Sequence, residues 1–567
     1  MATPLPKKYE DYKDWGWAEI GPHFEALLNR DVNEDTVIEW LTDWVNLYAL
    51  VSESYGRRQI ATTVDTTDKV AEERLMDFAE NVIEKAQAED QKLKEKFLAT
   101  GLEPQGFEIS LRNMRVDAEI FREANLPLAT QEHKLGIEYD QIIGAQMVEW
   151  EGEEKTLPQM NQYLLQPDRD VRERAFRAIM ERTLQDREKL NDLWGRFLDL
   201  RQTIAENAGF DNFRDYQWKA FHRFDYTPED CEKFHQAIEE TVVPAVQRLY
   251  EHKKRQLGLD ALRPWDLDVD PENKPPLKPF ETIDQLNSTV SQIFYAVDKR
   301  VGGYFDIMQA EKLLDLDSRK GKAPGGYCAY LPVSKRAFIF MNAVGTHDDV
   351  QTMLHEGGHA FHGFEFVTLP DYQQTDNLPI EFAEVASMSM ELLASPYLAK
   401  DKGGFYSEAD ASRAVVEHLE KNLRFWPYMA VVDAFQHWVY THIEEAKNAD
   451  NCDRKWSELW DRFMPGIDYS GLEDVKATGW HRKLHIFQIP FYYVEYGIAQ
   501  LGASQVWRNA LEDQSKAVNQ YLHALSLGGT VSLPKLFEAA GAKLAMDSTI
   551  VGEMVELHEK KLSELQA

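Results

Sequence analysis

Apolar side chains recur at helical spacing in residues 346–362, where the chain reads THDDVQTMLHEGGHAFH. Thr346 and Asp349 stand three residues apart just ahead of the first apolar position, which is the spacing of a capping box. We therefore predict a helix that begins at this pair and buries one face. The apolar positions that define the face are Val350, Met353, Leu354 and Phe361.

Helical periodicity also dominates other parts of the chain. Residues 37–54 and 68–98 read as two long helices that can pair as a hairpin, and residues 168–207 read as a helical stretch stopped by Gly209. Residues 107–115 and 147–157 carry β-favouring side chains, the second segment around a Glu-Gly turn. They predict one small β element that interrupts the helices.

Two further strands are predicted just ahead of the helix at 346–362. Residues 325–331 and 336–342 read as the arms of a hairpin. The fold class is thus mainly α, with a small β element beside this helix. The proline clusters of residues 262–280 cannot continue a helix and mark a surface excursion or a seam between subdomains, which Trp265, Leu267 and Val269 can anchor.

The composition narrows the possible partners and compartments. A net charge of −33 argues against nucleic acid, because neutralising phosphates requires clustered Lys and Arg. The charge keeps a protein soluble, and it also suits cationic peptides. The three cysteines, Cys231, Cys328 and Cys452, are too few and too scattered for a disulfide framework. With no signal-peptide core and no membrane-spanning run, we expect a cytoplasmic protein without a membrane partner.

The helix at 346–362 carries a candidate metal site in His355, Glu356 and His359, spaced His-Glu-x-x-His. Helical residues four apart lie one turn above each other, so the two imidazoles can converge on one ion. Glu356 then projects beside the metal and can take the proton from a water molecule bound there. Gly357 and Gly358 each cost a helix about 1 kcal/mol relative to Ala, which predicts the close approach of a neighbouring helix or strand.

A zinc ion on two histidines needs a third protein ligand and an open position for water. Residues 377–396 read as a second helix, which Asn377 can cap, with Pro379 in its first turn and Ser395-Pro396 at its end.

Three carboxylates share one face of this second helix. Glu381, Glu384 and Glu391 fall at i, i+3 and i+10, with Met and Phe between them. The alternative is a row of ordinary surface glutamates. Spacing leaves both Glu381 and Glu384 as candidates for the third ligand.

The two helices together resemble the oligoendopeptidase F and thimet oligopeptidase superfamily of zinc peptidases, through HEGGHAFH followed by EFAEVASMSMELL. The resemblance implies that Glu384 is the third ligand, because it opens the pattern Glu-x-x-Ser-x-x-x-Glu with Ser387 and Glu391. It assigns Glu391 to orienting a ligating histidine. It also implies one Zn²⁺ per chain, although the same donor set can hold iron, cobalt or manganese.

The resemblance extends over most of the chain from about residue 110, through HKLGIEYDQIIGAQMVEWEGEEKTLPQM and DRDVRERAFRA. It implies a helical N-terminal region at residues 1–205 and a catalytic region at residues 206–567. It also implies an elongated molecule with a deep internal substrate channel.

Residues 480–500, WHRKLHIFQIPFYYVEYGIAQ, are rich in groups that can donate a hydrogen bond to an oxyanion. The resemblance assigns this role to His485, Tyr493 and Tyr496. The chain departs from the thimet branch here. That branch has a glycine-rich loop between its histidine and its tyrosines, whereas this chain has no such loop and is one residue shorter between them. Tyr492 and His481 therefore stay as rivals, and core packing accounts for part of the cluster.

The first predicted strand carries the expected substrate-binding residues, Gly325, Gly326 and Tyr327. An extended peptide can pair with an exposed strand edge, and glycines let its backbone come close. The alternative is a buried structural hairpin. His362, at the end of the metal helix, is expected to pack or to support a ligand.

These features predict a zinc-dependent oligoendopeptidase that cleaves internal bonds of short peptides, with Glu356 as general base. A metallocarboxypeptidase or peptidyl dipeptidase of similar build is the alternative, although no Arg is clearly placed to hold a substrate carboxylate. An inactive peptide-binding helical scaffold is a further alternative. The sequence leaves the oligomeric state open.

Overall fold

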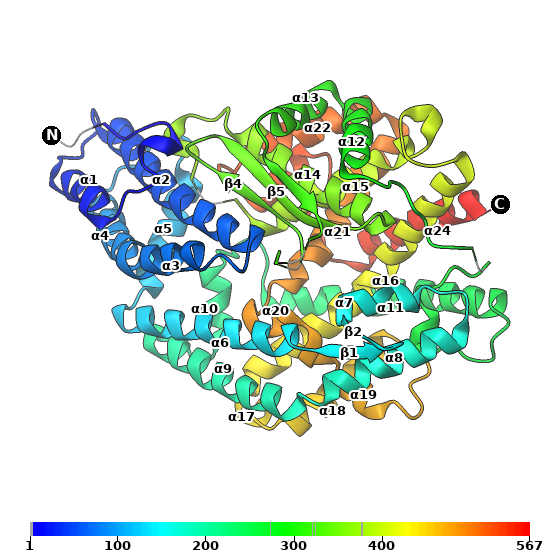
Figure 1. The fold of residues 1–567 in the computed structure, drawn as a ribbon. Coiled ribbons are helices and arrows are strands. Elements are labelled where there is room, and N and C mark those ends of the chain that lie inside the picture. The colour runs from blue at the N-terminus through cyan, green and yellow to red at the C-terminus, as the bar shows by residue number, and fades with distance from the viewer. Residues whose placement is uncertain (1–3, 273, 320, 324, 376–377, 567) are drawn as a thin grey trace. The chain divides into compact units, whose positions relative to one another are not determined.

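Helices make up most of the chain in a computed structural model that describes residues 4–272, 274–319, 321–323, 325–375 and 378–566. The predicted mainly α class is confirmed. The chain forms two compact units (Figure 1). Unit 1 comprises Met1–Glu119, Lys278–Ala414 and Ala499–Leu544, and unit 2 comprises Ile120–Leu277, Val415–Ile498 and Ala545–Ala567.

Unit 1 contains the helices at the N-terminus and those around the candidate metal site, together with a small sheet. Its elements are α1 Trp17–Asn29, α2 Val37–Val64, α3 Lys69–Phe78, α4 Glu84–Thr100, α5 Glu108–Ile120, α12 Ile283–Val297, α13 Lys299–Ala310, β3 Leu314–Asp317, β4 Tyr327–Leu331, β5 Arg336–Ala343, α14 His347–Phe366, α15 Ile380–Ala394, α22 Gln514–Ser526 and α23 Leu533–Ala539, and it shares α16 Glu408–Thr441 and α21 Tyr493–Glu512 with unit 2.

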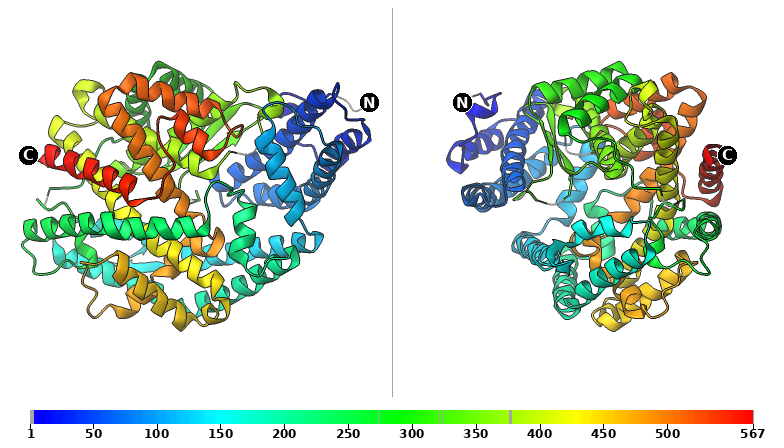
Figure 2. Two further views of the ribbon diagram at one scale, coloured as in Figure 1. Left: turned by 180° about the vertical axis from the view of Figure 1, so that it is seen from behind. Right: turned by 45° about the vertical axis from the view of Figure 1, so that its right-hand side comes forward.

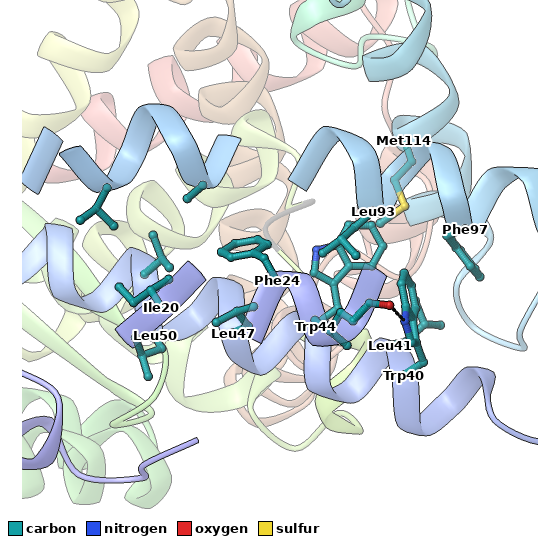
Figure 3. Packing of buried hydrophobic residues seen from close by; sticks show 14 of the residues in the cluster. Ile20, Phe24, Trp40, Leu41, Trp44, Leu47, Leu50, Leu93, Phe97 and Met114 are labelled. Carbon is teal, nitrogen blue, oxygen red and sulfur yellow. Dashed lines mark hydrogen bonds between the residues drawn. The ribbon is translucent and has the colours of Figure 1, made fainter. Parts of the chain in front are cut away.

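The N-terminal helices of unit 1 pack around an aromatic core (Figure 3). Trp40 and Trp44 lie in T-shaped contact, and the Trp40 indole N–H donates to the Leu27 carbonyl at 3.0 Å. The predicted helices at 37–54 and 68–98 are confirmed. The first continues to Val64, and a π-helical turn at Ala79–Ile83 divides the second.

The expected strand at residues 107–115 is wrong, because this segment opens helix α5. Phe107, Leu111 and Met114 are all buried in the N-terminal core. Their spacing of i, i+4 and i+7 puts one helical face into that core, and this packing overrides the β-favouring side chains.

A three-stranded sheet in the order β3-β5-β4 lies beside α14. The predicted hairpin is confirmed: β4 and β5 pair antiparallel from Tyr327 opposite Phe340 to Leu331 opposite Arg336. The sequence did not predict β3, which pairs parallel to β5. This strand order leaves β4 at an edge of the sheet.

The described residues of unit 2 form helices and one short hairpin. Its elements are α6 Leu126–Gly144, β1 Met147–Trp150, β2 Glu153–Thr156, α7 Leu157–Leu164, α8 Arg169–Leu184, α9 Arg187–Ala208, α10 Phe213–Ala220, α11 Pro228–Gln256, α17 Ile443–Ala446, α18 Ala449–Phe463, α19 Glu473–Ala477, α20 Leu484–Gln488 and α24 Ser548–Gln566. Helices α11 and α24, far apart in sequence, run side by side (Figures 1 and 2).

The hairpin β1–β2 confirms the predicted β element at residues 147–157. Glu151 and Gly152 form its turn with φ of 54° and 83°, the left-handed conformation that a two-residue hairpin turn requires. The predicted helical stretch at 168–207 is two helices, α8 and α9, and Gly209 ends the second with φ of 89°.

The proline-rich segment at residues 262–280 holds one of the boundaries between the two units, at Leu277 and Lys278. Trp265 and Val269 are buried and anchor the segment as predicted, whereas Leu267 is only partly buried. The expected division of the chain into residues 1–205 and 206–567 stays a prediction, as do the elongated outline and the deep channel.

Within the part of the chain that the structure describes, no helix combines the length and apolar character needed to cross a membrane. The structure describes all three cysteines and joins none of them in a disulfide.

Candidate metal centre

Helix α14 begins as its sequence predicts. The Thr346 side chain accepts the backbone N–H of Asp349, and the Asp349 carboxylate accepts the backbone N–H of Thr346 at 2.7 Å. The four apolar positions of the predicted face are fully buried, at 0% exposure: Val350, Met353, Leu354 and Phe361. The cap and this face together fix the rotation of the helix and hence the direction of its histidines.

The two glycines of the histidine turn lie where neighbouring helices come close, as predicted. A Cβ on Gly357 would lie 2.6 Å from the Phe294 ring of α12. A Cβ on Gly358 would lie 2.6 Å from both the Ala386 carbonyl oxygen and the Ser387 Cα of α15. The backbone of α15 therefore packs directly on this turn of α14.

Helix α15 forms where the second helix is predicted, with small differences at its ends. Pro379 is the N-cap instead of a first-turn residue, and the helix ends at Ala394 ahead of a 3₁₀ turn at Ser395–Tyr397. The expected cap Asn377 lies outside the described residues. Two of the carboxylates expected on its face, Glu381 and Glu384, are buried at 5% exposure each, so they are not ordinary surface glutamates.

One nitrogen each from His355 and His359 and one oxygen of Glu384 lie within 4.8 Å of one another. Glu384 Oε2 lies 3.4 Å from His355 Nε2 and 3.6 Å from His359 Nε2. Ser387 Oγ donates to the same oxygen at 3.0 Å and holds its rotamer. Two imidazoles and a carboxylate that converge in this way form a candidate metal site.

Glu391 reaches the opposite side of the His355 ring, where its Oε1 lies 2.7 Å from Nδ1. This contact fixes the ring and leaves Nε2 directed at Glu384. Burial lowers the pKa of His355, but Glu384 and Glu391 outweigh it and raise the pKa well above its ordinary value. A positive charge is therefore favoured between these carboxylates, which is the electrostatic condition for binding a cation.

Glu356 is buried beside the histidines, with 7% of its surface exposed. Burial raises its pKa to about 7, Glu384 and Glu391 add to the rise, and His355 opposes it. A carboxyl group with such a pKa can both accept and return a proton near neutral pH. His362, one turn further along, is buried against Phe382 and acts in packing.

The edge strand β4 reaches the same neighbourhood. Burial raises the pKa of the Cys328 thiol, and the nearby charge of Glu356 adds to the rise. Gly325 and Gly326, just before the strand, are exposed, and Gly325 has φ of 91°. Tyr327 is tied to Thr63 of α2 by a 2.6 Å hydrogen bond.

The predicted oxyanion residues form a ring cluster in unit 2. His485 of α20 lies 5.1 Å from Tyr493 and 5.7 Å from Tyr496, between ring centroids. The rival Tyr492 belongs to the same cluster, 5.2 Å from Tyr496. The rival His481 is buried elsewhere, with Nε2 2.8 Å from Asn191 Oδ1.

Two basic residues near this cluster were not found from the sequence. Arg223 donates to the Phe491 carbonyl at 2.6 Å and to Glu495 at 2.5 Å, and so shapes the turn that leads into α21. Lys483 lies 4.2 Å from the centre of the Tyr493 ring, and burial lowers its pKa to about 8. Arg223 is remote in sequence from the cluster, and no motif links them.

The fold and the site together define a mainly helical protein with a two-histidine, one-glutamate candidate metal centre. Residues 162–556 match Peptidase family M3, which is more than half of the chain. The chain belongs to this family, and the resemblance expected from its two motifs is confirmed.

Individual relatives agree with this assignment. The chain is 24% identical over 418 residues to an oligoendopeptidase F homolog of Lactococcus lactis subsp. lactis (strain IL1403), covering 70% of this chain and 64% of that protein. It is 21% identical over 439 residues to oligopeptidase PepF of Bacillus subtilis (strain 168), covering 73% and 60%. The matches thus span just under two thirds of the length of these relatives.

The fold is also similar to a solved structure described as PZ peptidase A with inhibitor 2. The TM-score is 0.88 at 26% identity, and the match covers 99% of this chain and 98% of that one.

Proposed function

We propose that this protein is a zinc-dependent oligoendopeptidase that hydrolyses internal peptide bonds of short peptides. The observation that carries the proposal is the convergence of His355, His359 and Glu384 with Glu356 buried beside them. The family and the names of the relatives agree with it, since they are called oligoendopeptidase or oligopeptidase.

The donor set fits zinc, because two imidazoles with one carboxylate match the ligands that zinc prefers. His355, His359 and Glu384 would hold one ion per chain, and Glu391 would orient His355. When bound, the ion would supply Lewis acidity, which would activate a water molecule and polarise the scissile carbonyl.

Glu356 is the proposed general base and acid. Its buried carboxylate beside the histidines is placed to take a proton from the attacking water and return it to the leaving amine. It stays out of the ligand set because it follows His355 directly and projects from the side of the same helical turn.

His485, Tyr493 and Tyr496 are the proposed donors to the oxyanion of the tetrahedral intermediate. Burial raises the pKa of Tyr493 well above its ordinary value, with Tyr428 and Tyr496 adding to the rise. Its hydroxyl therefore keeps its proton and can donate a hydrogen bond.

The edge strand β4, with Tyr327 at its start and Gly325 and Gly326 just before it, is the proposed binding strand for the substrate backbone. Pairing through the main chain gives affinity for many peptide sequences. We also infer a cytoplasmic location, because a chain with three scattered cysteines and no disulfide suits a reducing compartment.

The direct test of the site compares zinc content and cleavage of a blocked, internally quenched peptide. Glu356→Gln is expected to keep the zinc held by His355, His359 and Glu384 and to lose cleavage by about 10²-fold or more. Glu365→Gln makes the same change on α14 outside the histidine turn, and it should leave zinc content and peptide cleavage unchanged. Full activity in Glu356→Gln would reject the assigned base.

A further inference from the structure

A second group of side chains that could hold a metal ion lies in unit 2, on helices other than α14 and α15. Cys231 belongs to α11, whereas Asp433 and His437 belong to α16. One ligand atom from each of these three lies within 4.8 Å of the other two, and all three side chains are buried.

Each of the two helices contributes a pair of side chains at helical spacing to this cluster. Cys231 and His235 stand four apart on α11, and Asp433 and His437 stand four apart on α16. Each pair therefore shares a helical face. His235 Nε2 lies 2.8 Å from Asp433 Oδ2 and holds this carboxylate in place.

The cluster leaves polar atoms unsatisfied. Among the residues that the structure describes, Asp433 Oδ1 and His437 Nδ1 lack a hydrogen-bond partner. Asp433 is 0% exposed and His437 is 5% exposed. Burying such atoms without partners is costly, so a missing partner is expected. His437 Nε2 lies 3.3 Å from Asp433 Oδ2, close to the 3.4 and 3.6 Å between the ligand atoms of the candidate metal centre.

We propose that Cys231, Asp433 and His437 bind a second zinc ion, with His235 orienting Asp433. A thiolate with an imidazole selects zinc over magnesium or calcium, which prefer oxygen ligands. Three protein ligands and one water would complete four-coordination. The thiolate and the carboxylate would together balance the charge of the ion.

The second ion would brace the turn that leads into α21. The Phe491 N–H donates to Gln436 Oε1 at 2.8 Å, and the Phe491 ring lies 5.3 Å from that of His437. Phe491 has φ of 68° and stands two residues before Tyr493. This consequence for the oxyanion residues rests on the proposed function, whereas the metal site does not.

Cobalt substitution tests the proposal in the full-length protein. The protein is stripped of metal by a chelator and loaded with Co²⁺, and metal content and absorption are measured. We expect two cobalt ions per chain and a thiolate-to-cobalt charge-transfer band in the near ultraviolet. The site formed by His355, His359 and Glu384 contains no sulfur and cannot produce this band.

Three variants test which residues produce the charge-transfer band. Cys231→Ser should lose it and bind one ion, whereas Cys452→Ser, which changes another buried cysteine of unit 2, should keep the band and both ions. His359→Ala should keep the band while losing the other ion, so failure of the proposed function and failure of this site are separable. One ion per chain in the parent protein, or a band that survives Cys231→Ser, would overturn the proposal.

Discussion

Each candidate metal ligand is held in place by a second group. Glu391 contacts Nδ1 of His355, Ser387 donates to Glu384, and the backbone of Ala383 forms a hydrogen bond with His359. These supports set the direction of each donor atom before an ion arrives. Affinity for the metal therefore depends on residues that do not touch it.

Replacing Glu391 tests this dependence. Glu391→Gln removes the charged partner of His355, so we expect zinc affinity to fall about 10- to 100-fold. Competition with a chromogenic chelator measures the change. Glu381→Gln alters a buried carboxylate of the same helix and serves as the control. Equal losses of zinc affinity in the two variants would show that Glu391 has no specific role in orienting His355.

The sequence predicted those residues of the candidate site that lie close together in the chain. His355, Glu356 and His359 lie within five residues, and helical geometry alone brings the two imidazoles together. Glu384 needed the family resemblance, because spacing left Glu381 open. The group of Cys231, Asp433 and His437 went unseen, since it joins helices about 200 residues apart in the chain through packing alone.

At the scale of elements, the crossing of α14 and α15 depends on two glycines. The contact of Gly358 is with backbone atoms of Ala386 and Ser387, which no side-chain rotation can move. Tyr521 of α22 also donates to the Ala386 carbonyl at 2.8 Å, which ties a third helix to the crossing. The distance between the two helices sets the distance from the histidines to Glu384.

Adding a methyl group at this crossing should separate the helices. Gly358→Ala is expected to destabilise unit 1 by about 1–3 kcal/mol and to weaken zinc binding. A methyl group added at Gly303 of α13 would lie in open space, so Gly303→Ala should be neutral or stabilising by up to about 1 kcal/mol. Urea unfolding and zinc titration measure both effects. A Gly358→Ala protein as stable as its parent would contradict the packing account.

Some helices and strands are determined by their local sequence, and others by packing or pairing with distant residues. The capping pair and the apolar periodicity were enough to predict α14. Two strand-like segments joined by a short connection were enough to predict the hairpin of β4 and β5. Residues 107–115 were mistaken for a strand because burial of Phe107 in the N-terminal core decides their structure. Strand β3 has four residues and exists only through parallel pairing with β5, so no local pattern marks it.

At the scale of the whole chain, stability should fall in mild acid through His558. This side chain of α24 is fully buried against Trp426, and burial lowers its pKa to about 4, with His418 adding to the decrease. Below pH 6.5 the unfolded chain binds this proton and the folded chain does not. The folded state therefore loses stability as pH falls from about 6.5 to about 4.

Urea unfolding at pH 7 and pH 5 tests this prediction. The parent should lose about 2 kcal/mol more than His558→Gln between these two conditions, because the variant has no proton to gain at this position. Comparing the pH dependence of the two proteins removes the cost of the substitution itself. Identical pH dependence would contradict the assignment.

The central claim concerns what the protein cuts, and product mapping tests it most directly. A mixture of peptides of graded length, blocked at both ends, is incubated with the zinc-loaded protein, and the products are identified by mass spectrometry. The account predicts internal cuts confined to the shorter peptides. If no blocked peptide is cut while zinc is verified in the site, the oligoendopeptidase assignment is contradicted, and cutting of only unblocked C-termini would identify an exopeptidase instead.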